Sequence, residues 1–473
     1  MSADEEFVVP TGQRQLFIDG HGIESMDNLA RRLHQPSKKG AVIRPDFTRG
    51  ERGVQTRSAP HWDPEAEAFR LLADGEWYRS RDGIHWIRED RQPRGGDRGP
   101  AHHLLCDGGD AERRYKGFTM HTLDLDTGKV VEDDAEIADP EGKPWPGKKF
   151  AGMLDFAVSS DGLRWRKLPP SLPSGDEQNL SYDPLGRQYV ATIKRGGEYG
   201  RAHAITTSQD FENWSEPELS IQADGLDQEL GRLHIAEYLE TSNADYLRPF
   251  PRTPQWQWHN VDIYNAAVFR YEGIFLALPA VYHARGERWT SHTLRFTLIQ
   301  LWCSRDLRCW ERVDRRGTFI PWSQGASGAY DLNKNMPPSC PLVRGDELWF
   351  YYTGGKEYSV YPDPDPDRFA VCLALLRRDG FVSVDAGAEE GAILTRPFAP
   401  PRGSLRVNAD ARHGRLKVEV TDMEGHPLTT SEPIEGDHPR LEVPWSAGAP
   451  TKAGSVRLRF TLRRASLYSY WFE

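Results

Sequence analysis

The sequence has few cysteines, and their positions exclude several classes of protein. Five are present in 473 residues, at Cys106, Cys303, Cys309, Cys340 and Cys372. Their number is odd and no two have the spacing of a metal-binding or redox pair. This distribution is typical of incidental thiols in a reducing compartment. The sequence therefore predicts no disulfide framework, no metal site and no cofactor.

Long apolar runs and excess positive charge are also missing. No run of about 18 apolar residues exists, and residues 1–6 are acidic without the apolar core of a signal peptide. We therefore expect a cytoplasmic protein without a membrane partner. The net charge of −10 argues against a nucleic-acid partner. A homo-oligomer is compatible with all of these features.

Helical periodicity is absent almost everywhere, and residues 25–33 are the one short helix that we predict. The 43 glycines and 34 prolines instead favour a chain rich in turns. A pattern Ser-x-Asp-x-x-x-Trp occurs four times, each copy after an apolar or alternating run. The copies are Ser80–Trp86, Ser159–Trp165, Ser208–Trp214 and Ser304–Trp310.

The chemistry of this repeat is that of a turn. Its Ser and Asp side chains accept hydrogen bonds from backbone N–H groups nearby, and its Trp buries a large ring. Unequal spacing between copies favours propeller blades with inserted loops over a regular solenoid. A degenerate fifth copy is Arg378-Asp379-Gly380-Phe381. The fold class predicted is all-β, a five-bladed β-propeller with a C-terminal β-sandwich.

Domain boundaries follow from composition. Residues 1–14 are predicted to be a loose tail and residues 15–398 the propeller, in which residues 34–60 form a long loop. A Pro-rich stretch, Arg396–Gly403, ends it. Beyond it Val456, Leu458, Phe460 and Leu462 alternate with polar residues, so residues 402–473 are predicted to form a sandwich with one wet face per sheet.

Polar residues at the starts of the inner strands are the candidates for a site, because these ends line the funnel of a propeller. Asp63-Pro64 and Asp183-Pro184 fall at turns instead and are predicted to be structural. The candidate set contains Asp176, Glu177 and Asn179 in blade three, Asp262, Tyr264 and Asn265 in blade four, Asn335 in blade five, and Arg57 and His102 in blades one and two. Trp258 is predicted to stack on a sugar.

Carboxylates converging on one pocket suit glycoside hydrolysis. Glu177 is predicted to be the general acid, with a pKa raised by partial burial. Asp262 is predicted to be the base or nucleophile, held ionised by polar neighbours, with the catalytic candidate Asp176 beside them. The separation of the carboxyl groups would then decide between retention and inversion.

The chain resembles the five-bladed glycoside hydrolases of families 32, 43 and 68, the invertase and arabinanase groups. The residues that carry the resemblance are Gln15–Gly20, Val261–Tyr264 and Val456–Phe460. The resemblance implies a glycosidase acting on a furanoside or short oligosaccharide. The invertase motifs Asn-Asp-Pro-Asn-Gly, Arg-Asp-Pro and Glu-Cys are absent, so no catalytic residue is carried over.

Two other functions fit the sequence. A glycoside phosphorylase needs cationic groups around a phosphate, and Arg57, His102 and Lys334 are candidates for them. A propeller that binds carbohydrate without cleaving it needs no acid or base. Dependence of turnover on phosphate separates the first alternative from a hydrolase, and binding without cleavage identifies the second.

Overall fold

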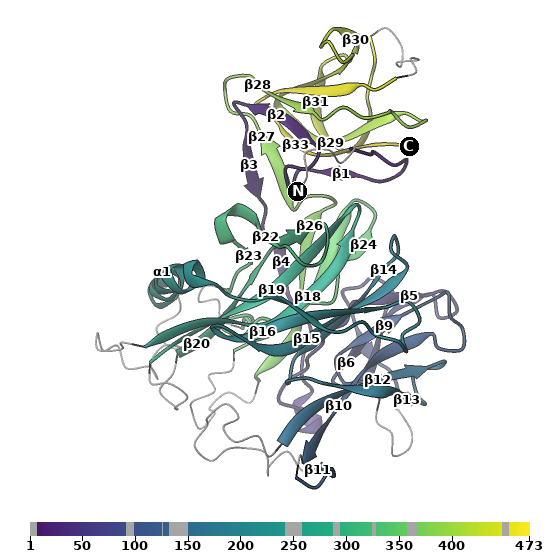
Figure 1. Cartoon of the computed structure of the whole chain (residues 1–473), viewed down its shortest axis with the longest axis vertical. Helices are drawn as coiled ribbons and strands as arrows, with labels where there is room; N and C mark the ends of the chain where they lie inside the picture. The colour runs from purple at the N-terminus through teal and green to yellow at the C-terminus, as the bar shows by residue number, and fades with distance from the viewer. Residues whose placement is uncertain are drawn as a thin grey trace.

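The structure is a computed structural model that describes residues 7–90, 99–124, 126–131, 150–241, 258–286, 294–323, 328–356, 367–446 and 454–473. The described strands form six sheets. Five are the blades of a propeller and the sixth, of ten strands, is a sandwich-like sheet beside it (Figure 1). The predicted fold class is confirmed.

The blades follow one another along the chain. Blade one contains β5 (His61–Asp63), β6 (Ala68–Ala73), β7 (Glu76–Ser80) and β8 (Ile87–Arg88). Blade two contains β9 (Leu104–Cys106), β10 (Tyr115–Asp124), β11 (Val130–Val131), β12 (Phe150–Ser159) and β13 (Arg166–Pro173). Blade three contains β14 (Gln178–Asp183), β15 (Gln188–Gly197), β16 (Gly200–Ser208) and β17 (Glu218–Ile221).

Blades four and five complete the ring. Blade four contains β18 (His259–Tyr271), β19 (Ile274–Arg285), β20 (Leu294–Gln300), β21 (Trp302–Ser304), β22 (Glu311–Arg312) and β23 (Thr318–Ile320). Blade five contains β24 (Leu342–Arg344), β25 (Glu347–Gly355), β26 (Phe369–Arg377) and β4 (Ser37–Ile43). Residues 348–352 are buried without interruption, because neighbouring blades cover both faces of this sheet.

The ring is closed by a strand from the start of the chain. β4 pairs with β26 as the outer strand of blade five, so the predicted long loop 34–60 is wrong at residues 37–43. Lys38 on this strand donates to the Pro321 carbonyl at 2.8 Å and to the Asp331 carboxylate at 2.9 Å. The Tyr352 hydroxyl donates to the same carboxylate at 2.8 Å. Closure thus joins β4 to the segment that connects blades four and five.

The repeated turns have the predicted chemistry. One carboxylate oxygen of Asp161 accepts from the backbone N–H groups of Leu163 and Arg164, at 2.8 and 2.9 Å. The same two bonds form at Asp82, Asp210 and Asp306. Trp214 stacks on Phe156 of blade two, with ring centroids 4.2 Å apart. Asp63 and Asp183 also accept from turn N–H groups, which confirms them as structural.

The sandwich takes strands from both ends of the chain. It contains β1 (Gln15–Leu16), β2 (Ile23–Asp27), β3 (Ala30–Leu33), β27 (Val382–Asp385), β28 (Gly391–Thr395), β29 (Leu405–Thr421), β30 (Pro427–Thr430), β31 (Ile434–Glu442), β32 (Arg457–Arg463) and β33 (Ser466–Phe472). The boundaries predicted at residues 15 and 398 do not match this pairing, because residues 15–33 and 382–395 belong to this sheet. Phe7 and Val9 are buried in its core, so they are not part of a loose tail.

A buried aspartate connects the sandwich to the propeller. Asp379, from the degenerate fifth repeat, accepts from Arg14 at 2.5 Å, from Ser469 at 2.6 Å and from the Tyr271 hydroxyl at 2.7 Å. Tyr271 lies in blade four, whereas Ser469 lies in the sandwich. The fifth repeat therefore keeps a turn at residues 378–381, but its aspartate side chain bonds residues of both domains instead of the N–H groups that follow it in the turn.

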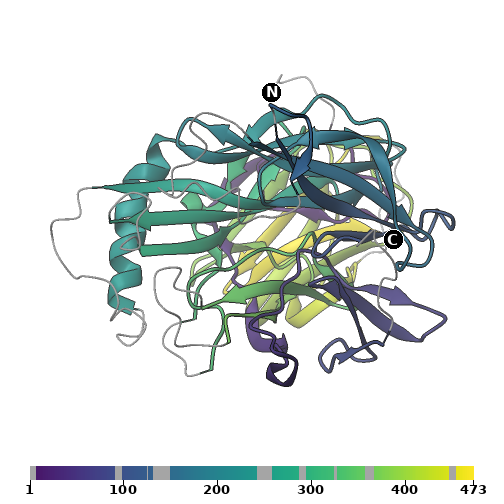
Figure 2. The ribbon, with the colours of Figure 1, turned by 90° about the horizontal axis from the view of Figure 1, so that it is seen from below.

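The helix is not where the sequence predicts it. Residues 23–27 and 30–33 form β2 and β3, because pairing with β28 and β27 outweighs their helical propensity. The helix described is α1 (Gly225–Thr241), which lies against blade four at the edge of the propeller (Figures 1 and 2). Two 3₁₀ turns span Phe47–Arg49 and Val313–Arg316. No helix in the described part of the chain is long and apolar enough to cross a membrane.

Replacing Asp161 by alanine is expected to lower the free energy of unfolding by about 1 kcal/mol, the usual loss when backbone N–H groups lose a capping side chain. Denaturant unfolding measures this. Asp346→Ala is the matched control, because Asp346 is exposed in a turn and no hydrogen bond of its carboxylate is found among the described residues. Equal stabilities of the two variants would contradict the capping role.

Candidate functional site

The first parts of the inner strands, and the segments that precede them, converge at one end of the propeller, which we call the funnel. They comprise residues 55–58, 102–103, 176–179, 262–265 and 331–339. The backbone N–H of Arg57 donates to the carbonyl of His102 at 2.9 Å, and Ser339 donates to the carbonyl of Arg57 at 2.7 Å. Blade one is thus tied to blades two and five, as the positions of the candidates predict.

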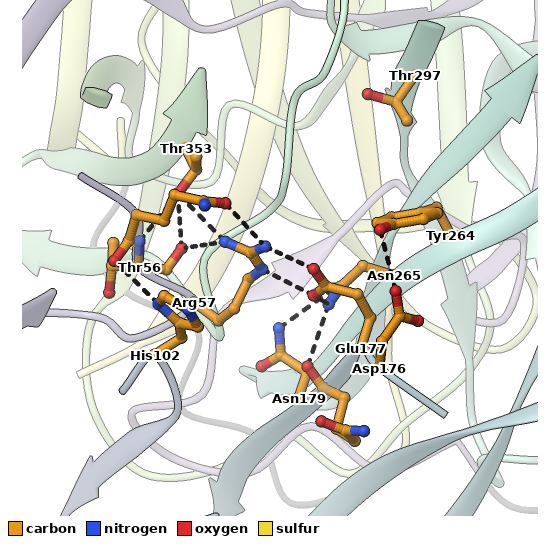
Figure 3. A network of polar contacts seen from close by, with 12 residues as sticks. Thr56, Arg57, His102, Asp176, Glu177, Asn179, Tyr264, Asn265, Thr297 and Thr353 are labelled. Atoms are coloured by element: carbon orange, nitrogen blue, oxygen red, sulfur yellow. Dashed lines mark hydrogen bonds and ion pairs between the residues drawn. The ribbon is translucent and has the colours of Figure 1, made fainter. Parts of the chain in front are cut away.

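A buried ion pair crosses the funnel from blade one to blade three. The Arg57 guanidinium donates to both carboxylate oxygens of Glu177, at 2.9 Å from Nε and 2.6 Å from Nη2 (Figure 3). The Asn265 amide of blade four donates to the same carboxylate at 2.8 Å. Asn179 reaches Asn265 with a long contact of 3.5 Å. These four predicted residues are therefore brought together.

The protonation predicted for Glu177 is wrong. Burial would raise the pKa of this carboxyl, but the Arg57 guanidinium outweighs burial and lowers the pKa well below the ordinary 4.5. Bidentate contact with a permanent cation stabilises the charged form. Glu177 therefore holds no proton at neutral pH, and the geometry does not suit a general acid.

Asp176 lies beside this pair and is open to solvent. Its side chain is 66% exposed, and it forms an ion pair with Lys194 on β15. The Tyr264 hydroxyl donates to its second oxygen at 3.1 Å (Figure 3). Desolvation by the surrounding groups would raise the pKa of its carboxyl, yet Lys194 outweighs this effect and lowers the pKa below the ordinary 3.8. Asp176 is an accessible, ionised carboxylate.

Three cations surround the ring of Tyr264. The Lys194 ammonium lies 4.1 Å from the ring centroid, the Arg201 guanidinium 5.1 Å and the Lys334 ammonium 5.3 Å. Cations within about 6 Å of an aromatic face are attracted to it. Tyr264 thus holds three cationic side chains close to the exposed carboxylate of Asp176.

Asp262 is less accessible than the sequence predicts. Its side chain is 2% exposed and accepts from Arg201 Nε at 3.0 Å. Burial raises its pKa more than the Arg201 guanidinium lowers it, and the ion pair with Arg201 is the polar contact that favours its charged form. Gly200 closes over it with φ +123°, and a Cβ there would lie 2.7 Å from the Asp262 carboxylate. Only glycine fits this close approach.

The remaining candidates lie around this group. His102 is beside Arg57, and burial, with Arg57, lowers the pKa of its imidazole to about 4. Asn335 is fully buried, and neither atom of its side-chain amide has a hydrogen bond among the described residues. The backbone carbonyl of Trp258 accepts from Gly286 at the open end of the β18–β19 hairpin, and no contact of its side chain with a predicted site residue is found within the described ranges.

Sequence reasoning missed three residues of the funnel. Lys194 and Arg201 lie on the middle strands of blade three, whereas the predicted site residues lie at the starts of inner strands. Asp74 lies in the turn between β6 and β7 and accepts from the backbone N–H of Gln55 at 2.9 Å. Its Asp-Gly dipeptide is typical of a hairpin turn, and this structural explanation gave no reason to place Asp74 in the site.

The described residues also include a cavity of about 780 Å³ that lies away from the funnel. It opens on the outer face of the sandwich, where short side chains of β2, β28 and β32 lie between charged ones. Its carboxylates and cations are equally numerous on this wet face. The funnel is favoured as the site because its charged groups are buried and mutually oriented. No cluster of three or more His, Cys, Asp or Glu able to hold a metal occurs among the described residues.

No family model and no curated protein matches the chain. Among solved structures, an N-acetylgalactosamine deacetylase from F. plautii is 10% identical, with a TM-score of 0.40 over 75% of this chain and 97% of that chain. An exo-β-1,3-galactanase from Phanerochaete chrysosporium is 9% identical, with 0.36 over 88% and 95%. A family 32 β-fructofuranosidase from Bombyx mori is 11% identical, with 0.37 over 93% of each chain.

Similarity at this level carries nothing about the reaction of this chain. The fold implied by the resemblance to five-bladed glycoside hydrolases is nevertheless confirmed, because the chain's own strands build the five blades.

Replacing Glu177 by glutamine is expected to destabilise the protein at neutral pH by about 3–5 kcal/mol, because the buried Arg57 loses its counter-charge. The folded carboxyl has a pKa below the ordinary 4.5, so its contribution is complete above that pH. As the pH falls through this value, the unfolded chain binds a proton that the folded chain does not, and the contribution declines. Denaturant unfolding from about pH 3.5 to 7 measures this.

The control is Glu442→Gln, which removes a surface ion pair with Arg406. Its effect should stay within about 1 kcal/mol at every pH. A stability difference between wild type and Glu177→Gln that does not depend on pH would contradict the ionised state of Glu177.

Proposed function

We propose that the chain is a glycosidase that binds a carbohydrate in the funnel and hydrolyses a glycosidic bond there. The observation that carries this proposal is Asp176, a carboxylate that is both ionised and 66% exposed at the floor of the funnel. An exposed anion in this position is able to accept a proton from water or to attack the anomeric carbon.

The other predicted catalytic residues have supporting roles in this proposal. Glu177 is only 11% exposed at its side chain and is fully engaged by Arg57 and Asn265, so it fixes the positions of blades one, three and four. Asp262 orients Arg201, which lies over the Tyr264 and Tyr282 rings. The half-buried Tyr264 and the buried Lys194 then define the direction in which Asp176 faces.

A glycoside phosphorylase is the second candidate, and the cations around Tyr264 favour it. Of the three groups predicted to bind phosphate, Arg57 is 3% exposed and bound to Glu177, and His102 is uncharged at neutral pH. Lys194, Arg201 and Lys334 are the groups that would face a phosphate. Release of a sugar 1-phosphate only in the presence of inorganic phosphate would identify this activity.

Asp176→Asn is expected to lower kcat by about 10²–10⁴-fold, because the amide neither accepts a proton nor attacks carbon. Turnover is measured on the members of a panel of 4-nitrophenyl glycosides and short oligosaccharides that the wild type cleaves. The fold should be intact, because the side chain is 66% exposed, the Asn oxygen still accepts from Lys194, and the Asn amide can donate to the Tyr264 hydroxyl. Asp346→Asn, in an exposed turn, is the control and should keep the wild-type rate.

Wild-type turnover by Asp176→Asn would remove the proposed role of this residue. Binding of an oligosaccharide in calorimetry, with no cleavage by the wild type, would instead identify a carbohydrate-binding propeller.

A further inference from the structure

Asp176 can accept a proton in the proposed reaction, but none of the predicted carboxyls is suited to donate one. Glycoside cleavage needs an acid that protonates the leaving oxygen. Each of the three predicted carboxyls has a Lys or Arg partner: Glu177 has Arg57, Asp176 has Lys194, and Asp262 has Arg201. A permanent cation at hydrogen-bond distance favours the ionised form of a carboxyl. Asp262, whose pKa is nevertheless raised, is only 2% exposed.

Asp74 differs from these three in its partner. Its Oδ1 lies 3.3 Å from Nδ1 of His102, and no Lys or Arg nitrogen within 4 Å of its carboxyl is found in the described ranges. Its Oδ2 accepts from the backbone N–H of Gln55 at 2.9 Å. Asp74 therefore lies against the segment that carries Arg57, at the funnel end of blade one. Its side chain is 37% exposed and that of His102 is 29% exposed, so both reach solvent.

The backbone fixes the carboxyl in this position. Asp74 and Gly75 have φ of +46° and +75°, the combination of a two-residue type I′ turn between β6 and β7. The backbone N–H of Asp74 donates to the Gln55 carbonyl at 3.0 Å, and Gly75 donates to the Ala101 carbonyl at 2.8 Å. The turn is thus tied to the segments before the inner strands of blades one and two.

Burial favours the protonated form of Asp74. It raises the pKa of this carboxyl to about 7, with the carboxylates of Glu51 and Glu76 acting in the same direction, against the Gln55 N–H bond and the charge of Arg57, which lower it. Glu51 and Glu76 are themselves paired with Arg49 and Arg88. His102 offers no cation at neutral pH, because burial and Arg57 lower the pKa of its imidazole to about 4.

We propose that Asp74, held between Gln55 and His102 at the rim of the funnel, is the catalytic proton donor. The inference rests on the proposed glycosidase function and adds a residue to it. The O–H bond of Asp74 breaks and its proton passes to the glycosidic oxygen as the bond from that oxygen to the anomeric carbon breaks. Water attacks the anomeric carbon and gives a proton to Asp176. Exchange with solvent returns a proton to Asp74 and removes one from Asp176.

The test is Asp74→Asn on two substrates of one sugar. Asparagine tolerates positive φ and still accepts from Gln55, so the turn should fold. On an oligosaccharide that the wild type cleaves, kcat/KM should fall by about 10²–10⁴-fold. On the 2,4-dinitrophenyl glycoside, whose leaving group needs no proton, the loss should be below about tenfold. The alkaline limb of the wild-type pH profile, near pH 7, should disappear in the variant.

A readout independent of turnover accompanies the kinetics. Infrared difference spectra should show a protonated carboxyl that titrates near pH 7 in the wild type and is absent from Asp74→Asn. Equal losses on both substrates, an unchanged alkaline limb, or no such infrared signal would each overturn the proposal. A wild-type protein that cleaves no glycoside overturns both proposals together, whereas an active wild type with an unaltered Asp74→Asn variant overturns this one alone.

Discussion

The ion pair between Arg57 and Glu177 is the interaction on which the funnel depends. It spans the channel, it is buried, and both carboxylate oxygens are used. Desolvating two charges costs several kcal/mol, and their attraction offsets this only when geometry and further hydrogen bonds are good. Asn265 supplies such a bond, and Thr353 supplies a longer contact of 3.4 Å. The pair is thus better understood as a device that fixes blades one, three and four than as a source of net stability.

A funnel assembled from five blades holds its shape only if the ring does not open. The closing strand β4 comes from the start of the chain and pairs with the last blade, so closure requires both ends of the propeller. The chain passes from the sandwich to the propeller at residues 34–36 and returns to the sandwich at 378–381. β3 and β27, the sandwich strands next to these two crossings, pair with each other. Asp379 then binds residues of both domains. The sandwich therefore secures the two segments through which the ring would otherwise open.

Much of this architecture is predictable, because its signals are local. A Ser-x-Asp turn followed by Trp needs only neighbouring backbone groups, so its four copies reveal the blades. The elements that were predicted wrongly depend on partners far away in the sequence. Residues 25–33 have helical propensity but pair with strands some 360 residues away. Helix α1 is concealed because its buried positions are Asp227, Gly231, Ile235 and Tyr238, only two of which are apolar.

The contrast between local signals and distant partners also holds for the candidate site. Position alone brings Arg57, Glu177, Asn179 and Asn265 together, because inner-strand starts must converge in any propeller. Protonation is set by which cation each carboxyl meets, and Lys194 and Arg201 lie on strands that no local pattern connects to the funnel. The direction of the pKa shift predicted for Glu177 is consequently reversed. The residue type and strand position of a carboxyl identify it as a candidate. Its protonation state, and so its role, depends on the charged side chain that it contacts.

This dependence on partners has a physical consequence for the chemistry of the funnel. Carboxyls bound to Arg or Lys are acceptors over the whole range in which the protein is folded, since their partners stay charged. A carboxyl whose nearest base is a neutral imidazole has no such fixed charge, and its proton follows the pH near neutrality. Blade three of this propeller contains the first kind, at Asp176 and Glu177, and the turn at Asp74 in blade one contains the second. The proposed acid in blade one and the proposed base in blade three therefore differ in their partners and not in residue type, because the cations are distributed unequally between the blades.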